Sequence, residues 1–321
     1  MMRRFLILLG LLASAPALAA PPVILAACTE DISDCIFQST VTVDATAGHF
    51  TAGRARFGLI ASPNSAIPPS GRIETKTFTP SSDFWVSANY YSPAGGANNY
   101  GQYVSIGFVD NGVNRLLLRV TGTGGGIPLM LTTRNAIGTL NNVVPAGAGA
   151  VCSVGNKCKI DVHIRYGVSG GVDVYNNGTN ILTYSGNVTT DGATTINQVY
   201  FAMMPQSTSA TTWSEMIVSD TDTRTMQAYS CVATAPGNTQ GWTGSAANIS
   251  ANTAVSTTFN YVTTSPVLSQ WTVNPASCSI PTTGNVAIVD VREHAALAAG
   301  QTGPQNARMS LGLRCGLQQW G

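Results

Sequence analysis

The chain has 321 residues, of which 44% are hydrophobic, so it can bury a large core and its length favours two domains. Only 10% of its residues are charged, and 16 basic against 15 acidic side chains leave a formal net charge of +1. This balance excludes a strong attraction to nucleic acid or to an anionic membrane surface. The scarcity of charge is typical of short strands joined by turns, so we expect an all-β protein.

Residues 1–19 are predicted to be a signal peptide. Arg3 and Arg4 precede the apolar run 5–12, and Ala17-Leu18-Ala19 has the small-residue pattern of a bacterial-type cleavage site. The run is too short to span a bilayer. We therefore expect a secreted protein, or one in the periplasm or on the cell surface, with no transmembrane segment.

A second processing site stays open, because Leu25-Ala26-Ala27-Cys28 resembles the lipobox at which bacterial lipoproteins are cut and acylated on cysteine. Pro21 and Pro22 would interrupt the apolar segment that leads into such a site. Ordinary secretion is therefore favoured over a lipoprotein at Cys28. On this interpretation residues 20–34 form an N-terminal linker.

The cysteines indicate an oxidising compartment. There are seven, namely Cys28, Cys35, Cys152, Cys158, Cys231, Cys278 and Cys315. Cys28 with Cys35 and Cys152 with Cys158 would each close a short loop, and the last three can supply one more bridge. None of the spacings is that of a zinc site, so we predict disulfides.

Alternation of apolar and polar residues begins near Phe37 and recurs through the chain. The clearest case sets Ile160, Val162, Ile164 and Tyr166 against Asp161, His163 and Arg165. We predict that the first set faces the core and the second faces water. Asp110-Asn111-Gly112 and Asn176-Asn177-Gly178 are turn sequences that predict hairpins.

Regularly spaced strands without intervening helices predict a β-sandwich or β-barrel over residues 35–226. Turn residues and cysteines begin again after a polar segment at 219–225, so we place a boundary near Met226. Residues 227–321 are predicted to form a smaller β-sandwich. Its expected strands are 255–262, 270–273, 286–292 and 309–314.

Two groups of residues resemble known proteins. Residues 159–166 followed by 171–178 resemble the central strands of concanavalin A-like, or laminin G-like, domains. This resemblance implies an antiparallel jelly-roll β-sandwich over residues 35–226. Residues 213–224, followed by 241–244 and 303–305, resemble uncharacterised bacteriophage and prophage virion proteins. The second resemblance implies an exposed tail or fibre component that binds a surface. The signal peptide and the cysteines instead favour a host-encoded, exported relative.

The loop after an aromatic-rich strand is the candidate ligand site. It includes Tyr90, Tyr91, Asn98, Asn99 and Tyr100. Tyrosine rings offer flat apolar faces and asparagines offer paired donors and acceptors, the combination that a sugar ring needs. Alternation lets only one of Tyr90 and Tyr91 face solvent. We expect this loop to bind a cell-surface glycan or another surface ligand.

Catalytic chemistry has little support in the sequence. Glycosidases of this fold place paired carboxylates on one strand, whereas Glu215 stands alone and Asp161 and Asp173 lie on separate strands. Glu215, alone on its strand, is expected to tie down a turn. His163 is predicted to be a surface residue, and the sequence predicts neither a GxSxG elbow, which joins a strand to a helix, nor an HExxH helix. No catalytic residue is predicted.

Asp220 and Asp222 could offer oxygens to calcium, the one cofactor considered, although such residues more often bond backbone amides in a turn. The sequence as a whole favours a non-enzymatic, exported surface-recognition or adhesion module. Two alternatives stay open. One is a phage-derived virion structural protein that self-associates or binds other subunits. The other is a glycan-cleaving hydrolase, which needs two carboxylates about 5 to 10 Å apart in a groove.

Overall fold

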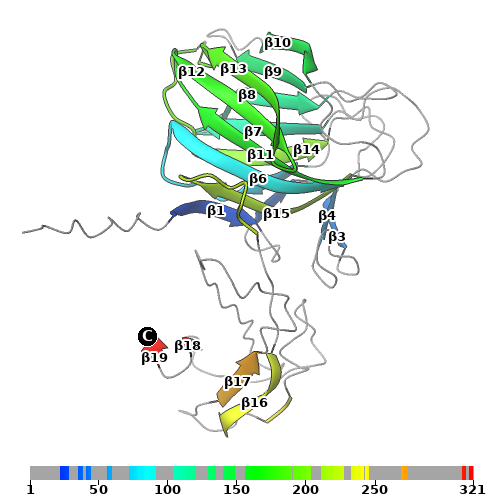
Figure 1. The fold of residues 1–321 in the computed structure, drawn as a ribbon, viewed down its shortest axis with the longest axis vertical. Coiled ribbons are helices and arrows are strands. Elements are labelled where there is room, and N and C mark those ends of the chain that lie inside the picture. Colours follow the sequence, from blue (N-terminus) through cyan, green and yellow to red (C-terminus); the bar gives the residue numbers. More distant parts are fainter. Residues whose placement is uncertain are drawn as a thin grey trace, which may run out of the picture.

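The computed structural model describes residues 22–28, 35–38, 41–44, 56–59, 72–91, 104–120, 129–134, 140–148, 156–189, 191–203, 211–227, 233–241, 243–245, 269–273, 313–315 and 318–320. Every regular element in these ranges is a β-strand, which confirms the all-β prediction (Figure 1). Within the same ranges, no helix has the length and apolar character needed to cross a membrane. The predicted signal peptide at 1–19 lies outside the described residues.

The main body is an antiparallel β-sandwich whose two sheets form stacked layers in Figure 1. The eight-stranded sheet contains β1 (Ile24–Cys28), β3 (Val41–Asp44), β4 (Arg56–Leu59), β6 (Asp83–Tyr91), β11 (Lys157–Arg165), β12 (Gly170–Asn176), β13 (Thr179–Gly186) and β15 (Thr211–Ser219). Its order is β13-β12-β11-β6-β15-β4-β3, and β1 also pairs with β15.

The seven-stranded sheet forms the second layer. It contains β2 (Cys35–Gln38), β5 (Arg72–Thr75), β7 (Val104–Asp110), β8 (Val113–Val120), β9 (Leu129–Arg134), β10 (Leu140–Ala148) and β14 (Gln198–Met203). Its order is β10-β9-β8-β7-β14-β5-β2. Strands from both ends of residues 24–219 therefore meet in one sandwich, as a jelly roll requires.

Two tight turns set the register of the hairpins that build the sheets. Asn111 and Gly112 join β7 to β8 with φ of 50° and 79°, and Asn177 and Gly178 join β12 to β13 with φ of 47° and 80°. Positive φ at both central residues matches the twist of paired strands and favours Asn-Gly. Both predicted hairpins are confirmed.

Large apolar side chains from both sheets fill the space between the layers. Phe84 of β6 packs against Phe108 of β7 with ring centroids 6.2 Å apart, and Phe201 of β14 packs against Trp213 of β15 at 5.0 Å. All four are fully buried. Their burial excludes water from the interior and fixes the spacing of the layers. The inward face predicted for β11 is also buried.

The N-terminal segment differs from the linker predicted at residues 20–34. Ala26, Ala27 and Cys28 of β1 pair with β15, so the sandwich begins before residue 35. Cys28 forms a disulfide with Cys35 of β2, which belongs to the other sheet. This strand has no apolar–polar alternation. Its pairing and the disulfide hold it in place.

The predicted Cys28–Cys35 bridge is confirmed, and Cys158 is also disulfide-bonded. Cys152, Cys231 and Cys278 lie outside the described residues. In the C-terminal part, β16 (Ala233–Gln240) pairs with β17 (Ser269–Val273), and β18 (Leu313–Cys315) pairs with β19 (Gln318–Trp320). β17 confirms the strand predicted at 270–273, and β18 overlaps the one predicted at 309–314. The strands predicted at 255–262 and 286–292 lie outside the described residues, so a second sandwich stays a prediction.

The disulfide should contribute measurably to stability, because it ties the two layers through a short loop. We expect the Cys28→Ser/Cys35→Ser double variant to lose about 2 to 3 kcal/mol of unfolding free energy. Denaturant titration of both proteins without reductant measures the difference. A double variant as stable as the oxidised wild type would contradict this role.

Tyr166 follows β11 and is buried, and its burial raises the pKa of the phenol to about 12. An unfolded tyrosine ionises near pH 10. Between these pH values the unfolded chain releases a proton that the folded chain keeps. The contribution of Tyr166 to the free energy of unfolding is therefore complete below pH 10 and is lost as the pH rises towards 12. The free energy of unfolding should fall by at most about 1.4 kcal/mol per pH unit in this range. Tyr166→Phe should flatten this decline in denaturation curves.

Tyr184→Phe is the control, because the Tyr184 hydroxyl lies at the surface and donates to the Asn187 carbonyl. It should leave the decline unchanged. An equal decline in the Tyr166→Phe and wild-type proteins would show that another group causes it.

Candidate functional site

The outer face of the eight-stranded sheet carries polar and aromatic side chains on β6, β11 and β12. Asp83, Trp85, Ser87 and Asn89 of β6 lie opposite Arg165, His163, Asp161 and Lys159 of β11. On the other side of β11, Asp173 and Tyr175 of β12 lie opposite His163 and Asp161. Strand alternation turns all these side chains away from the core. Residues far apart in sequence thus share one surface.

His163 lies at the centre of a hydrogen-bonded chain. Its Nδ1 is 2.9 Å from Arg165 Nη1 and its Nε2 is 2.8 Å from Asp83 Oδ1. A guanidinium can only donate, so Nδ1 accepts and Nε2 carries the proton that it donates to Asp83. Arg165 also pairs with Asp173 at 2.6 Å. The chain of contacts fixes the tautomer of the imidazole.

Two carboxylates flank this one ring. Asp83 contacts Nε2, while Asp173 Oδ2 lies 3.8 Å from Nδ1 on the other side. The Asp83 side chain is 67% exposed and the His163 side chain 17%. The chain of contacts therefore ends on a carboxylate that solvent can reach.

Packing holds these groups in position. The Trp85 ring stacks on the His163 ring with centroids 4.4 Å apart and an interplanar angle of 5°. Arg165 lies beside Gly171, where a Cβ would come within 2.8 Å of Arg165 Nη2. Glycine at this position leaves room for the guanidinium to reach both His163 and Asp173.

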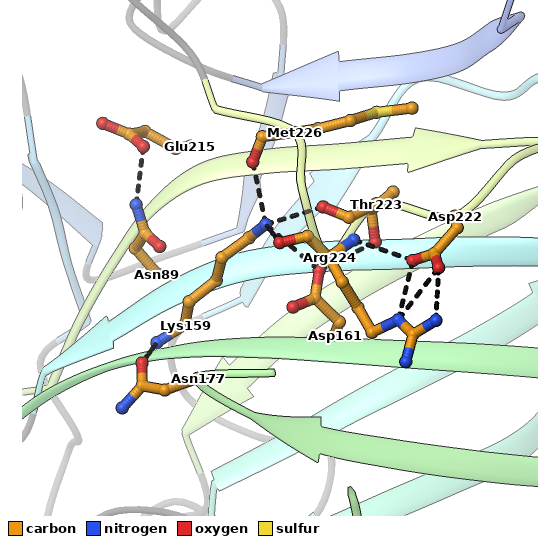
Figure 2. Close-up of polar contacts among 9 residues, drawn as sticks. All are labelled: Asn89, Lys159, Asp161, Asn177, Glu215, Asp222, Thr223, Arg224 and Met226. Atoms are coloured by element: carbon orange, nitrogen blue, oxygen red, sulfur yellow. Dashed lines mark hydrogen bonds and ion pairs between the residues drawn. The ribbon is translucent and has the colours of Figure 1, made fainter. Parts of the chain in front are cut away.

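A second group of contacts binds the chain that leaves β15 to the same face. We call residues 221–226 the exit strap. Figure 2 shows Lys159 Nζ pointing at three strap carbonyls, those of Thr223, Arg224 and Met226, at 2.6, 3.0 and 2.8 Å. Burial lowers the pKa of Lys159, and the nearby Asp161 carboxylate opposes that effect. An amine that donates three hydrogen bonds is an ammonium, so Lys159 is a clamp rather than a base.

The exit strap covers Asp161, and the prediction that this residue faces water is wrong. Its side chain is fully buried, with Oδ1 accepting from Thr223 Oγ1 at 2.8 Å and lying 3.4 Å from Lys159 Nζ. Alternation along β11 correctly gave the outward direction. It could not reveal that a later segment returns across the sheet.

Glu215 lies in β15 at a bulge, with a positive φ of 52° that non-glycine residues rarely adopt. Its Oε2 accepts from Asn89 Nδ2 at 2.6 Å, and both side chains are buried. The bulge aims this carboxylate at β6. Glu215 therefore bonds to a neighbouring strand, whereas the sequence predicted that its side chain ties down a turn.

Of the five residues predicted to bind a ligand, the structure describes Tyr90 and Tyr91. Tyr90 is buried in the core against Trp213, with centroids 4.9 Å apart, so a surface ligand cannot reach its ring. Tyr91 ends β6 and lies in register with Lys157. Asn98, Asn99 and Tyr100 lie outside the described residues.

Both carboxylates considered for calcium accept hydrogen bonds from the protein. Asp220 Oδ1 accepts from the Val23 N–H at 2.8 Å, and Asp222 Oδ1 accepts from the Arg224 N–H at 2.9 Å. Asp222 also pairs with the Arg224 guanidinium at 2.5 Å. In the part of the chain that the structure describes, no group of three His, Cys, Asp or Glu side chains could hold a metal.

Sequence reasoning missed Asp83 and the role of Trp85 beside His163. The alternation of β11 identified His163 and Arg165 as neighbours on one face, and the hairpin to β12 could have added Asp173. The pairing of β6 with β11 joins segments some 80 residues apart in the chain. No local sequence pattern predicts such a pairing.

No protein-family model matches the sequence, and no curated protein sequence matches it significantly. Solved structures that it resembles include an endo-beta-1,4-glucuronan lyase from the fungus Trichoderma reesei, at 9% identity and a TM-score of 0.48, covering 62% of this chain and 96% of that one. An alginate lyase aligns at 13% identity and a TM-score of 0.37, covering 60% and 85%. The globular domain of T. cruzi calreticulin aligns at 10% and 0.43, covering 62% and 89%.

Identities this low concern the fold alone and assign no site residue to this chain. The prediction of a non-enzymatic module is nevertheless corrected, because two of these three structures are polysaccharide lyases. The argument from carboxylates along one strand also fails, since Asp83 and Asp173 approach His163 from different strands. None of the three structures supports the resemblance to virion proteins.

The clamp on the exit strap can be tested directly. Lys159→Met should lower the unfolding free energy by about 3 kcal/mol, because three carbonyls and the buried Asp161 lose their cationic partner. Adding Asp161→Asn to that variant should restore part of the loss, since no unpaired charge then remains buried. Denaturant titration measures both effects. Lys157→Met, on the same strand but exposed, is the control and should change little; an equal loss there would refute the clamp.

Proposed function

We propose that the protein cleaves a polysaccharide on the outer face of the eight-stranded sheet, with Asp83 and His163 as its proton-transfer pair. The observation that carries this proposal is the chain Asp173–Arg165–His163–Asp83, which ends on an exposed carboxylate. These hydrogen bonds orient the Asp83 carboxylate and leave it accessible to a substrate.

The proposed chemistry follows from the groups present. Breaking a glycosidic bond requires proton transfer to or from the reacting sugar or water, by a group within hydrogen-bond reach. Asp83 is the acceptor best placed for this role, because the His163 Nε2–H fixes its orientation at 2.8 Å. Asp173 pairs with Arg165 and contacts Nδ1 only at 3.8 Å, so it positions the ring.

A glycan suits this face for two further reasons. Trp85 and Tyr175 bring aromatic rings beside the carboxylates, which is the mixture of flat apolar and polar groups that sugars require. The groups also lie on neighbouring strands of one sheet, so an extended polymer could contact several of them at once. A polysaccharide therefore fits better than a small, enclosed substrate.

We also propose that the protein works outside the reducing cytoplasm. The Cys28–Cys35 disulfide and the disulfide-bonded Cys158 support this location. The first bridge uses the thiol that lipidation at Cys28 would need. It therefore favours ordinary secretion over the lipoprotein alternative.

Cleavage can be tested on soluble polysaccharides of three kinds: an amino-sugar polymer such as chitosan, a neutral β-glucan, and the acidic polymer alginate. New reducing ends report any cleavage, and ultraviolet absorbance of an unsaturated product reports elimination. We expect the wild type to cleave at least one of them. Asp83→Asn and His163→Gln should each lower kcat by about 10²- to 10⁴-fold.

Asp220→Asn is the matched control, because Asp220 is exposed and bonds only the distant Val23 in the described structure. It should keep wild-type activity. A wild-type protein that cleaves none of the three polymers, or an Asp83→Asn variant that cleaves as fast as wild type, would overturn the proposal.

A further inference from the structure

The Arg224 side chain covers the aromatic pair next to the His163 chain. Its guanidinium carbon lies 4.5 Å from the centre of the Tyr175 ring and 5.3 Å from that of Trp85. The two rings are themselves stacked, with centroids 5.8 Å apart, and both are half-buried on the outer face. A cation over two aromatic faces is an arrangement that binding sites for cationic ligands use. Here the cation belongs to the protein.

The backbone and the side chain of Arg224 are held very differently. The backbone of the exit strap is fixed, because Lys159 clamps three of its carbonyls and Thr223 bonds the buried Asp161. The guanidinium is bonded to Asp222, two residues away, and both side chains are more than a third exposed. The pair is bidentate, with Nε and Nη2 of Arg224 both on the Asp222 carboxylate, but solvent reaches it, and exposed ion pairs contribute only about 1 kcal/mol or less. The side chain can therefore leave the rings while the strap stays in place.

We infer that Trp85 and Tyr175 form a subsite for a positively charged amino sugar, which competes with Arg224 for the two rings. The inference rests on the proposed function and adds the class of glycan that it acts on. A glucosamine unit offers both features that Arg224 offers: an ammonium group for the rings and carboxylates, and C–H groups that pack on an aromatic face.

The charges around the rings favour the same ligand. With Arg224 turned away, this face carries four carboxylates, those of Asp83, Asp161, Asp173 and Asp222, and two cationic side chains, those of Arg165 and Lys159. Asp222 would then be released to pair with the incoming ammonium. An acidic sugar would meet an excess of negative charge at this place. A neutral sugar would gain the ring contact alone.

The test uses three hexamers that share one β-1,4 backbone: glucosamine hexamer, its N-acetylated form and cellohexaose. Binding to the full chain is measured by calorimetry in a His163→Gln background, which switches off the proposed cleavage. We expect the glucosamine hexamer to bind at least about tenfold more tightly than the other two. Its affinity should fall as salt is added, because charge contributes to it.

Variants test the role of the Arg224 side chain separately from that of the two aromatic rings. Arg224→Ala should tighten glucosamine hexamer binding by about 3- to 10-fold, because the ligand no longer competes with the guanidinium. Tyr175→Leu should weaken binding of the glucosamine hexamer by tenfold or more. Lys157→Ala, which removes an exposed cation elsewhere on the same sheet, should leave that binding unchanged. Arg224 is exposed, so its replacement keeps the fold and the experiment interpretable.

Each outcome decides between the two proposals. Equal binding of the three hexamers, no binding of the glucosamine hexamer, or no effect of Arg224→Ala would overturn the subsite. If the glucosamine hexamer binds as expected but the wild type cleaves no polysaccharide, the subsite stands and the proposed cleavage fails. If the wild type cleaves only alginate or the neutral glucan, the cleavage stands and the subsite fails.

Discussion

The pairing of β6 with β11 is the constraint from which the outer-face site follows. Nine residues of each strand pair in one continuous register, from Lys157 opposite Tyr91 to Arg165 opposite Asp83. That register places the indole of Trp85 beside the imidazole of His163 and brings the Asp83 carboxylate to the ring. A shift by one residue would send all these side chains into the core. The buried side chains on the inner face of both strands hold the register, so core packing also positions the polar groups outside.

The exit strap adds a second layer to this face. Lys159 holds the strap by its carbonyls, which any sequence could supply, while the side chains of Thr223 and Arg224 give it specific contacts with Asp161 and the aromatic rings. The strap thereby divides the outer face into two parts. One part is buried under the backbone and stable. The other, around His163, is covered only by a side chain, and this is the part to which we assign chemistry.

The sequence predicted the parts of the fold that local patterns encode. The Asn-Gly turns and the alternation of β11 identified two hairpins and the inward face of a central strand. Prediction from the sequence failed where contacting residues are distant in the chain. β1 was taken for a linker because its alanines mask its strand character. Asp161 was expected to face water because no pattern shows where the exit strap returns. The site was missed for the same reason. Asp83 and Asp173 belong to different strands, so a search for two carboxylates on one strand could not find them.

An experimental structure of the His163→Gln variant with bound glucosamine hexamer tests the central claim most directly. The account predicts the oligosaccharide along the outer face of the eight-stranded sheet, with one glycosidic oxygen within hydrogen-bond reach of Asp83. It further predicts a sugar ring on Trp85 and Tyr175, with Arg224 turned away. An oligosaccharide bound to the seven-stranded sheet, or one that leaves Asp83 without contact, would contradict the assignment of this face as the site of cleavage.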